Sequence, residues 1–139
     1  QREHPRCLFT GFVPRGELAR HFASADVYVH ASLTETFGNV LTEALASGLA
    51  VAGFDYAAAR QFVQHGRNGL TVPCHRPDAL VEAAVLLATD ELLRTQLRLA
   101  ARAAVEPQSW ENVITRFEAD LGVVAGRPSP ADTVHPVPA

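Results

Sequence analysis

The chain has 139 residues, of which 47% are hydrophobic and 19% are charged, and its formal net charge is −3. This length suits one modest domain, and the apolar content is sufficient for a real core. The negative charge argues against a nucleic-acid partner bound by phosphate neutralisation, and no apolar run approaches the roughly 20 residues that span a bilayer.

The first residues show no signal-peptide pattern, and the sequence contains no methionine. We therefore expect an N-terminally truncated fragment or a processed piece of a longer chain. Cys7 and Cys74 lie far apart and in no metal-like spacing, which favours reduced thiols in a cytoplasmic protein. A location at the inner face of the membrane, with peripheral membrane association, stays open for the parent protein.

The first half of the sequence predicts alternating strands and helices. Short apolar runs bounded by Gly, Pro or polar residues predict four strands, over residues 7–13, 27–30, 49–54 and 69–72. Helical spacing falls between them, over residues 15–26, 38–47 and about 60–64. Gly48 is the expected C-terminal cap of the middle helix.

The second half is predicted to be helical, with helices over residues 77–90, 91–105 and 109–122. Ser109 is the expected N-cap of the last helix, which carries one apolar face from Trp110 to Leu121. We assign residues 1–124 to a partial ligand-binding domain. Residues 125–139 form a Pro-rich tail that we expect to be disordered.

Strands that alternate with helices predict an α/β fold with a parallel sheet of about four strands. Such sheets bind ligands on the loops that follow the carboxyl ends of their strands. The segment "LTETFGNVLTEALASGLAV" lies at such a place. Glu35 is in the loop after a strand. The next helix begins at Phe37, Gly38 and Asn39, and Glu43 lies about one turn inside that helix.

Free N–H groups at the start of this helix suit a phosphate, and Gly38 would let the ligand approach the backbone closely. A glutamate would repel phosphate but accepts hydrogen bonds from sugar hydroxyls. Glu35 and Glu43 on either side of a phosphate-binding turn therefore match the ribose, diphosphate and hexose of a nucleotide sugar. The alternative is that Glu35 is solvated and Glu43 pairs with a nearby Arg; the residues alone leave both interpretations open.

The same segment resembles the E-x7-E segment of retaining nucleotide-sugar glycosyltransferases of the GT-B architecture, the glycosyl transferases group 1 type. The resemblance runs from about Arg6 to Val123 and includes "LFTGFV", "ASADVYVHAS", "FDYAAARQFVQHGRNGLTV" and "SWENVITRFE". It implies that the chain is the donor half of a GT-B fold, with an incomplete Rossmann-like sheet.

The resemblance also implies roles for individual residues. Glu43 would accept hydrogen bonds from the ribose hydroxyls, and the catalytic Glu35 would hold hydroxyls of the donor sugar near the reacting carbon. The backbone at Phe37, Gly38 and Asn39 would contact the diphosphate and sugar, and Val40 would pack near the ribose. Such enzymes transfer a hexosyl group with retention and usually need neither a metal nor a cofactor.

Some expected parts are absent from this sequence. The acceptor domain, two strands of the donor sheet and a basic phosphate-binding loop would precede the chain, so we expect this fragment alone to be inactive. In the family order 3-2-1-4-5-6, the strands here would be 3, 4, 5 and 6. "DYAAAR" replaces a common Gly-Gly. Alternatives to the transferase are a truncated, non-catalytic nucleotide-sugar-binding remnant and a GT-B nucleotide-sugar epimerase.

Four further polar residues are weaker candidates. His30 ends a strand and could face the site, although a satisfied core histidine is the favoured interpretation. His65 fits the turn "QHGRNG". Arg60 could approach phosphate or be solvated, and Asp26 is expected to be a turn or cap residue.

Overall fold

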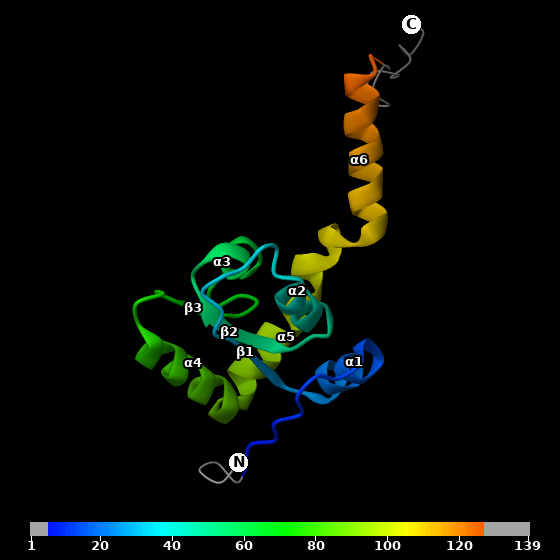
Figure 1. Ribbon diagram of the computed structural model, residues 1–139. Helices are drawn as coiled ribbons and strands as arrows, with labels where there is room; N and C mark the ends of the chain where they lie inside the picture. The colour runs from blue at the N-terminus through cyan, green and yellow to red at the C-terminus, as the bar shows by residue number, and fades with distance from the viewer. Residues whose placement is uncertain (1–5, 127–139) are drawn as a thin grey trace, which may run out of the picture. The chain divides into compact units, whose positions relative to one another are not determined.

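The computed structural model describes residues 6–126, which form two compact units divided along the chain between Ala104 and Val105. The first unit alternates helices and strands along the chain (Figure 1). Its elements are α1 (Arg15–Ser24), β1 (Val27–His30), α2 (Asn39–Ala46), β2 (Ala50–Phe54), α3 (Ala57–Phe62), β3 (Leu70–Val72), α4 (Pro77–Thr89) and α5 (Glu91–Val105).

The strands form one parallel sheet in the order β1-β2-β3. Val27 of β1 pairs with Ala50 of β2, and Ala52 of β2 pairs with Leu70 of β3. The predicted parallel α/β fold is therefore confirmed. Because all three strands run the same way, the loops that follow them meet at one edge of the sheet, where ligands bind in such folds.

The strand predicted for residues 7–13 does not form, so the sheet has three strands among the described residues instead of about four. The backbone turns at Gly11, where φ is +64°, and Leu8 and Phe12 are exposed. An extended segment needs a neighbouring strand to pair its N–H and C=O groups. Among the described residues, no other strand pairs with the edge of β1 that faces away from β2.

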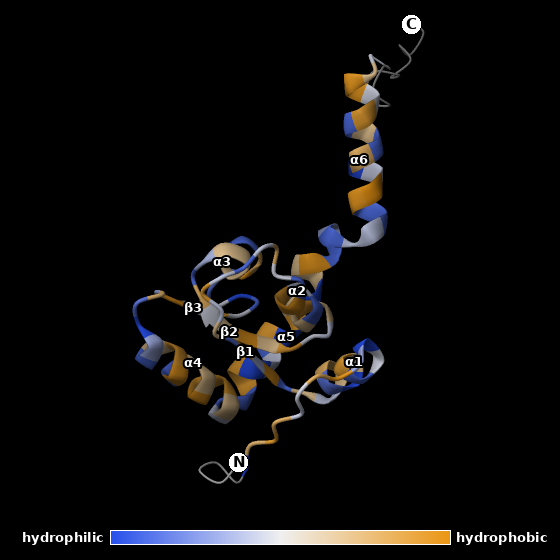
Figure 2. Ribbon diagram, viewed as in Figure 1, coloured by the Kyte–Doolittle hydropathy of each residue, from blue (hydrophilic) through white to orange (hydrophobic). Residues whose placement is uncertain are grey.

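The central strand β2 is buried along its whole length, and successive residues face opposite helix layers. Ala50, Ala52 and Phe54 share a hydrophobic cluster with Leu87 of α4 and Leu97 of α5. The helices α2 and α3 lie on the other side of the sheet from α4 (Figure 1). Figure 2 shows the hydrophobic colouring of the sheet between these layers. The sheet is thus covered on both faces, as its short apolar strands require.

The end of α2 is fixed by glycine at position 48, which has φ of +75°. Gly48 N–H donates to Leu45 O at 2.9 Å, and Leu49 N–H donates to Ala44 O at 3.1 Å, which is the Schellman arrangement. The guanidinium of Arg98 in α5 also donates to the Gly48 carbonyl, at 2.9 Å. This confirms Gly48 as the helix stop and connects α2 to α5.

The start of α2 is fixed by a second glycine, Gly38, whose φ is +85°. A Cβ built on Gly38 would overlap the Cβ of Ala58 in α3. Glycine was expected here because it would admit a ligand close to the backbone. The structure gives two other reasons: the left-handed conformation and the space that Ala58 already occupies.

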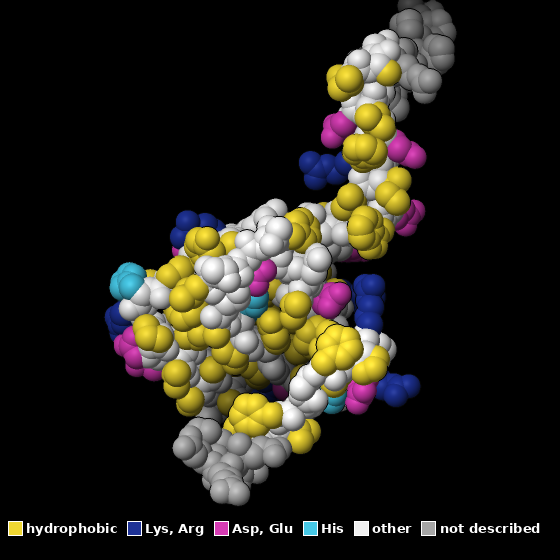
Figure 3. All heavy atoms as spheres, in the orientation of Figure 1, with side chains coloured by type: hydrophobic (Ala, Val, Ile, Leu, Met, Phe, Trp, Pro, Cys, Tyr) yellow, Lys and Arg dark blue, Asp and Glu magenta, His cyan; other side chains and the backbone are white. Residues whose placement is uncertain are grey.

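The second unit contains a short 3-10 turn, η1 (Glu106–Gln108), and the helix α6 (Trp110–Val124). The Ser109 hydroxyl accepts a hydrogen bond from Asn112 N–H, so the predicted N-cap is confirmed, while the helix runs two residues past the predicted end. Figure 3 shows apolar side chains along α6. Beyond Gly126 the predicted tail lies outside the described residues. None of the helices within residues 6–126 has both the length and the hydropathy needed to cross a bilayer.

The first prediction compares the two glycines that bound α2. Gly38→Ala should lower the free energy of unfolding by about 2 to 4 kcal/mol, because the new methyl group adds overpacking to the cost of positive φ. Gly48→Ala is the matched control, since nothing lies within 4 Å of its Cβ position. It should cost only about 1 to 2 kcal/mol. Equal losses in urea unfolding of the two variants would show that the contact with Ala58 is unimportant.

Candidate functional site

The candidate site lies where β1 and β2 end. The loop over residues 31–38 leads from β1 into α2, and Asp55 and Tyr56 lead from β2 into α3. Ser32 Oγ donates to Thr34 O at 2.9 Å within the first loop. Both loops therefore bring helix N-termini to the same edge of the sheet.

Glu35 lies in the first of these loops, and its side chain is 17% exposed. Its Oε1 atom is 3.1 Å from Nε2 of His30, which is buried at the end of β1. The interpretation of Glu35 as a solvated residue is therefore wrong. His30 is a satisfied buried histidine, as favoured from the sequence, and it also contacts the predicted catalytic glutamate.

Both ring nitrogens of His30 have polar neighbours, because Nδ1 lies 3.2 Å from the hydroxyl of Tyr28. Tyr28 and His30 are two positions apart on β1 and so point to the same side of the sheet. Burial raises the pKa of Tyr28 above its ordinary value, and the charge of Glu35 raises it further. The tyrosine hydroxyl therefore keeps its proton at neutral pH.

The first turn of α2 offers backbone donors to a ligand. Gly38 is the N-cap residue without a side-chain cap, and the first helical hydrogen bond is the one from Thr42 N–H to the Gly38 carbonyl, at 3.1 Å. The N–H groups before Thr42 have no partner within the helix, and no acidic residue occupies its first turn. Asn39 and Val40 are exposed. This geometry, together with the positive end of the helix dipole, suits an anionic group.

Phe37 anchors the loop just before this turn. Its ring packs against Phe62 of α3 with a centroid distance of 5.9 Å in an edge-to-face arrangement, while half of the residue stays exposed. This contact holds the loop at position 37 against α3.

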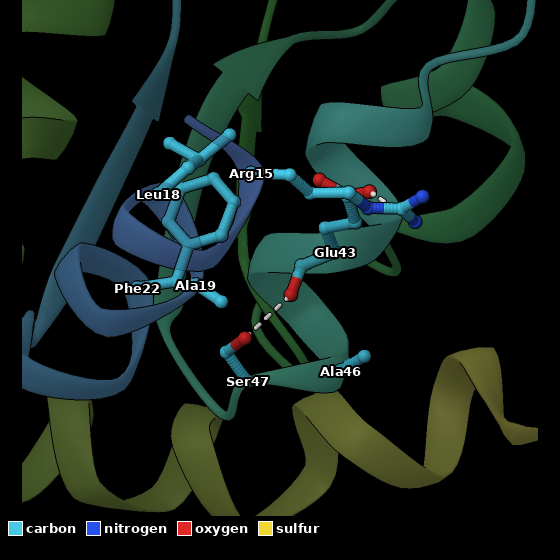
Figure 4. A pocket seen from close by; sticks show the side chains of 7 residues that line it. All are labelled: Arg15, Leu18, Ala19, Phe22, Glu43, Ala46 and Ser47. Atoms are coloured by element: carbon cyan, nitrogen blue, oxygen red, sulfur yellow. Dashed lines mark hydrogen bonds and ion pairs between the residues drawn. The ribbon is translucent and has the colours of Figure 1, made fainter. Parts of the chain in front are cut away.

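Glu43 lies in the second turn of α2 and faces a depression of about 290 Å³ between α1 and α2. Figure 4 shows its lining, which consists of Arg15, Leu18, Ala19 and Phe22 from α1 and Glu43, Ala46 and Ser47 at the end of α2. The guanidinium of Arg15 is 3.7 Å from Glu43 Oε1. The alternative in which Glu43 pairs with an arginine is therefore observed. Because the Arg15 side chain is 91% exposed, such a pair contributes little stability and leaves Glu43 available to a ligand.

A row of aromatic rings connects the surroundings of the two glutamates. Phe22 of α1, which lines the depression beside Glu43, meets Tyr28 edge to face at 5.8 Å. Tyr28 in turn lies 5.8 Å from the ring of His30, which contacts Glu35. Sequence reasoning missed Tyr28 and Arg15. The spacing of Tyr28 and His30 at alternate strand positions was the signal that could have found the tyrosine.

The backbone after β2 is strained next to the Gly38 contact. Ala57 has φ of +42°, a left-handed conformation that costs a residue with a Cβ about 1 to 2 kcal/mol. It lies within "DYAAAR", where Gly-Gly is common in the resembled family. The chain therefore keeps a glycine-like conformation here with an alanine in place.

The weaker candidates have structural partners. Arg60 Nε donates to Asp55 Oδ1 at 3.1 Å, and its Nη2 donates to the Asp55 carbonyl at 2.7 Å. Asp26 accepts from Arg98 of α5 at 2.6 Å, which fits its expected place at a turn. Thr71 N–H donates to His65 Nδ1 at 3.1 Å, so His65 belongs to the turn before β3. Within residues 6–126, no three His, Cys, Asp or Glu side chains are grouped as metal ligands would be.

Comparison with known proteins gives a consistent result. The model of the family described as glycosyl transferases group 1 matches residues 1–90. A GDP-mannose-dependent alpha-mannosyltransferase of Mycobacterium tuberculosis is 37% identical over 127 residues. That match covers 91% of this chain and 33% of the relative, so the chain spans about a third of the length of this curated relative.

Solved structures agree with the fold. A sucrose-phosphate synthase from Thermosynechococcus elongatus superposes with a TM-score of 0.76 at 27% identity, over 87% of this chain and 31% of that protein. The C-terminal domain of a glycosyl transferase group 1 family protein from Francisella tularensis gives 0.63 at 26% identity, over 70% of this chain and 50% of that one.

The second prediction concerns Tyr28, one of only two tyrosines. In a Tyr56→Phe background, ultraviolet titration should give Tyr28 a pKa above the ordinary value of about 10. Because burial is the larger cause, Glu35→Gln should lower this pKa only part of the way. The folded state then holds a proton that the unfolded state has lost, so stability should fall as pH rises above about 10. A Tyr28 that titrates at its ordinary value would contradict the described surroundings.

Proposed function

The chain belongs to the group 1 glycosyl transferases, and on this basis we propose that it is the donor-nucleotide domain of a hexosyltransferase. The intact parent would transfer a hexosyl group, with retention, from a nucleotide-diphosphate sugar to an acceptor hydroxyl. The parallel sheet and flanking helices are the Rossmann-like half of the GT-B architecture. An N-terminal acceptor domain is the proposed partner of this half.

The observation that carries the proposal is the placement of two glutamates around the open N-terminus of α2. Gly38 caps the helix without a side-chain cap, Glu35 reaches the same turn from the preceding loop, and Glu43 faces the depression toward α1. A diphosphate at the helix start would meet N–H donors and the positive dipole end. Hydroxyl groups on either side of it would meet carboxylate acceptors.

The two glutamates have different proposed roles. Glu43 binds the ribose hydroxyls, with Val40 packed near the ribose. Glu35 holds hydroxyls of the donor sugar beside the reacting carbon, and the backbone at Phe37, Gly38 and Asn39 contacts the diphosphate. The protein's contribution to catalysis is then electrostatic stabilisation of the departing nucleotide diphosphate. No metal or organic cofactor is part of this proposal. GDP-mannose is the first donor to test, because the mycobacterial relative is named for it.

The third prediction separates the roles of the glutamates in the proposed parent enzyme. Glu43→Ala should weaken nucleotide diphosphate binding by roughly 10- to 100-fold, because it removes charged hydrogen bonds to the ribose. Glu35→Ala should lower kcat on the order of 100-fold and leave affinity for the free nucleotide nearly unchanged, because its contacts strengthen in the transition state. Calorimetry and initial rates measure the two effects.

Glu17→Ala is the matched control for these variants, since Glu17 is an exposed acid on α1 outside the lining of the depression. It should change neither quantity. An equal loss of nucleotide affinity in both glutamate variants would reject the assignment to opposite ends of the ligand. Nucleotide-sugar binding by the parent without any turnover would favour a non-catalytic remnant over a transferase.

The fourth prediction concerns the 139-residue chain by itself. We expect it to be inactive and to self-associate, because within residues 6–126 no strand pairs with the free edge of β1 and because Leu8 and Phe12 are exposed. Sedimentation at increasing concentration should show association, and a radiolabelled GDP-mannose assay should show no transfer. Hexosyl transfer by the purified chain, with no other protein present, would prove that the site is complete without an acceptor domain.

A further inference from the structure

His30 has no role in the proposed function, yet both of its ring nitrogens are engaged. Its side chain is 6% exposed, Nε2 lies 3.1 Å from Glu35 Oε1, and Nδ1 lies 3.2 Å from the Tyr28 hydroxyl. A histidine buried only for packing would not need a polar contact with Glu35, the glutamate that the proposed function places beside the donor sugar.

The partners indicate where the hydrogen of a neutral His30 ring lies. A carboxylate oxygen accepts hydrogen bonds, so the neutral ring that fits Glu35 has its hydrogen on Nε2. In the neutral ring Nδ1 is then an acceptor, and the Tyr28 hydroxyl donates to it. Burial, followed by the Glu35 charge, raises the pKa of Tyr28, which keeps that donor protonated. The three side chains form one directed row, from Tyr28 through His30 to Glu35.

This row leaves the second oxygen of Glu35 facing the start of α2. Oε1 is taken by His30, while Oε2 lies 3.5 Å from the Cβ position of Gly38. A free glutamate side chain would sample several rotamers, and a hydrogen bond from a buried ring removes most of that freedom. The carboxylate is therefore held with one oxygen occupied and the other beside the turn that would bind the diphosphate.

The row is itself held by packing from two neighbouring elements, β2 and α1. His30 pairs in register with Gly53 of β2, and a Cβ on Gly53 would lie 3.4 Å from the His30 Cβ. Phe22 of α1 packs edge to face against Tyr28. The ring of His30 thus has little room to turn away from Glu35.

We propose that His30 is a positioning residue, which orients the Glu35 carboxylate so that Oε2 faces the first turn of α2 and the hydroxyls of the donor sugar. The inference rests on the proposed function, because Glu35 is its target. Tyr28 sets the direction of the row by donating to Nδ1. His30 itself does not touch the donor.

The test compares His30→Gln with His30→Leu in the proposed parent enzyme. The Gln amide can occupy the place of Nε2 and donate to Glu35, whereas Leu fills the space without a donor. His30→Leu should lower kcat by about 10- to 100-fold, as loss of a residue that supports a functional group does. His30→Gln should restore kcat to within a few-fold of the wild type. Affinity for the free nucleotide diphosphate should be unchanged in both variants.

Three results would overturn the inference: wild-type kcat in His30→Leu, no recovery in His30→Gln, or a loss of nucleotide affinity equal to the loss of kcat. The last of these would mean that His30 only supports the fold. Melting temperatures of both variants accompany the kinetics, and His30→Gln keeps the test decisive if the Leu variant does not fold.

A second measurement is independent of turnover. Nitrogen-15 NMR of histidine-labelled parent protein, with the His30 signal assigned by its loss in His30→Gln, reports the tautomer directly. A hydrogen on Nε2 with an unprotonated Nδ1 is expected. A neutral ring with its hydrogen on Nδ1 would contradict the proposed hydrogen bonds from Tyr28 to His30 and from His30 to Glu35. If the wild type neither binds nor transfers a nucleotide sugar, the proposed function fails. The spectrum still tests the hydrogen bonds of His30 with Tyr28 and Glu35.

Discussion

Gly38 and Ala58 lie so close together that no side chain fits at position 38, and this contact joins the start of α2 to the start of α3. The remaining geometry of the site depends on it. The positive φ of Gly38 turns the loop after β1 into the helix, and the same turn places Oε2 of Glu35 beside it. Ala57, the residue before Ala58, has φ of +42°, so the backbone next to this contact is also in the left-handed region.

The two glutamates of the site differ in how firmly they are held. Glu35 is mostly buried and contacts a buried histidine through Oε1, so its carboxylate is held in place. Glu43 is 40% exposed and pairs with an exposed arginine, so it can exchange that partner for a ligand at little cost. A fixed carboxylate suits a reacting sugar, where small displacements matter, and a free one suits a binding contact.

Apolar periodicity in the sequence predicted the parallel α/β fold, and the residue types at helix ends predicted the stop at Gly48 and the cap at Ser109. Each of these depends on neighbours within a few residues, or on a pattern that only a sheet buried on both faces explains. The strand predicted for residues 7–13 was wrong for the opposite reason. Its apolar residues fit a strand, but strand formation needs a pairing partner, and local pattern carries no information about one.

The sequence by itself also predicted that Glu35, Gly38 and Glu43 lie around one helix start, since Glu35 precedes the expected helix in its loop, Gly38 begins it and Glu43 lies about one turn inside it. Only the tertiary structure decided their surroundings. The contacts of Glu35 with His30 and of Gly38 with Ala58 join residues from different elements, and the register of β1 on β2 sets where those elements meet. Contacts of this kind depend on how strands and helices pack together, which residue spacing along the chain does not specify.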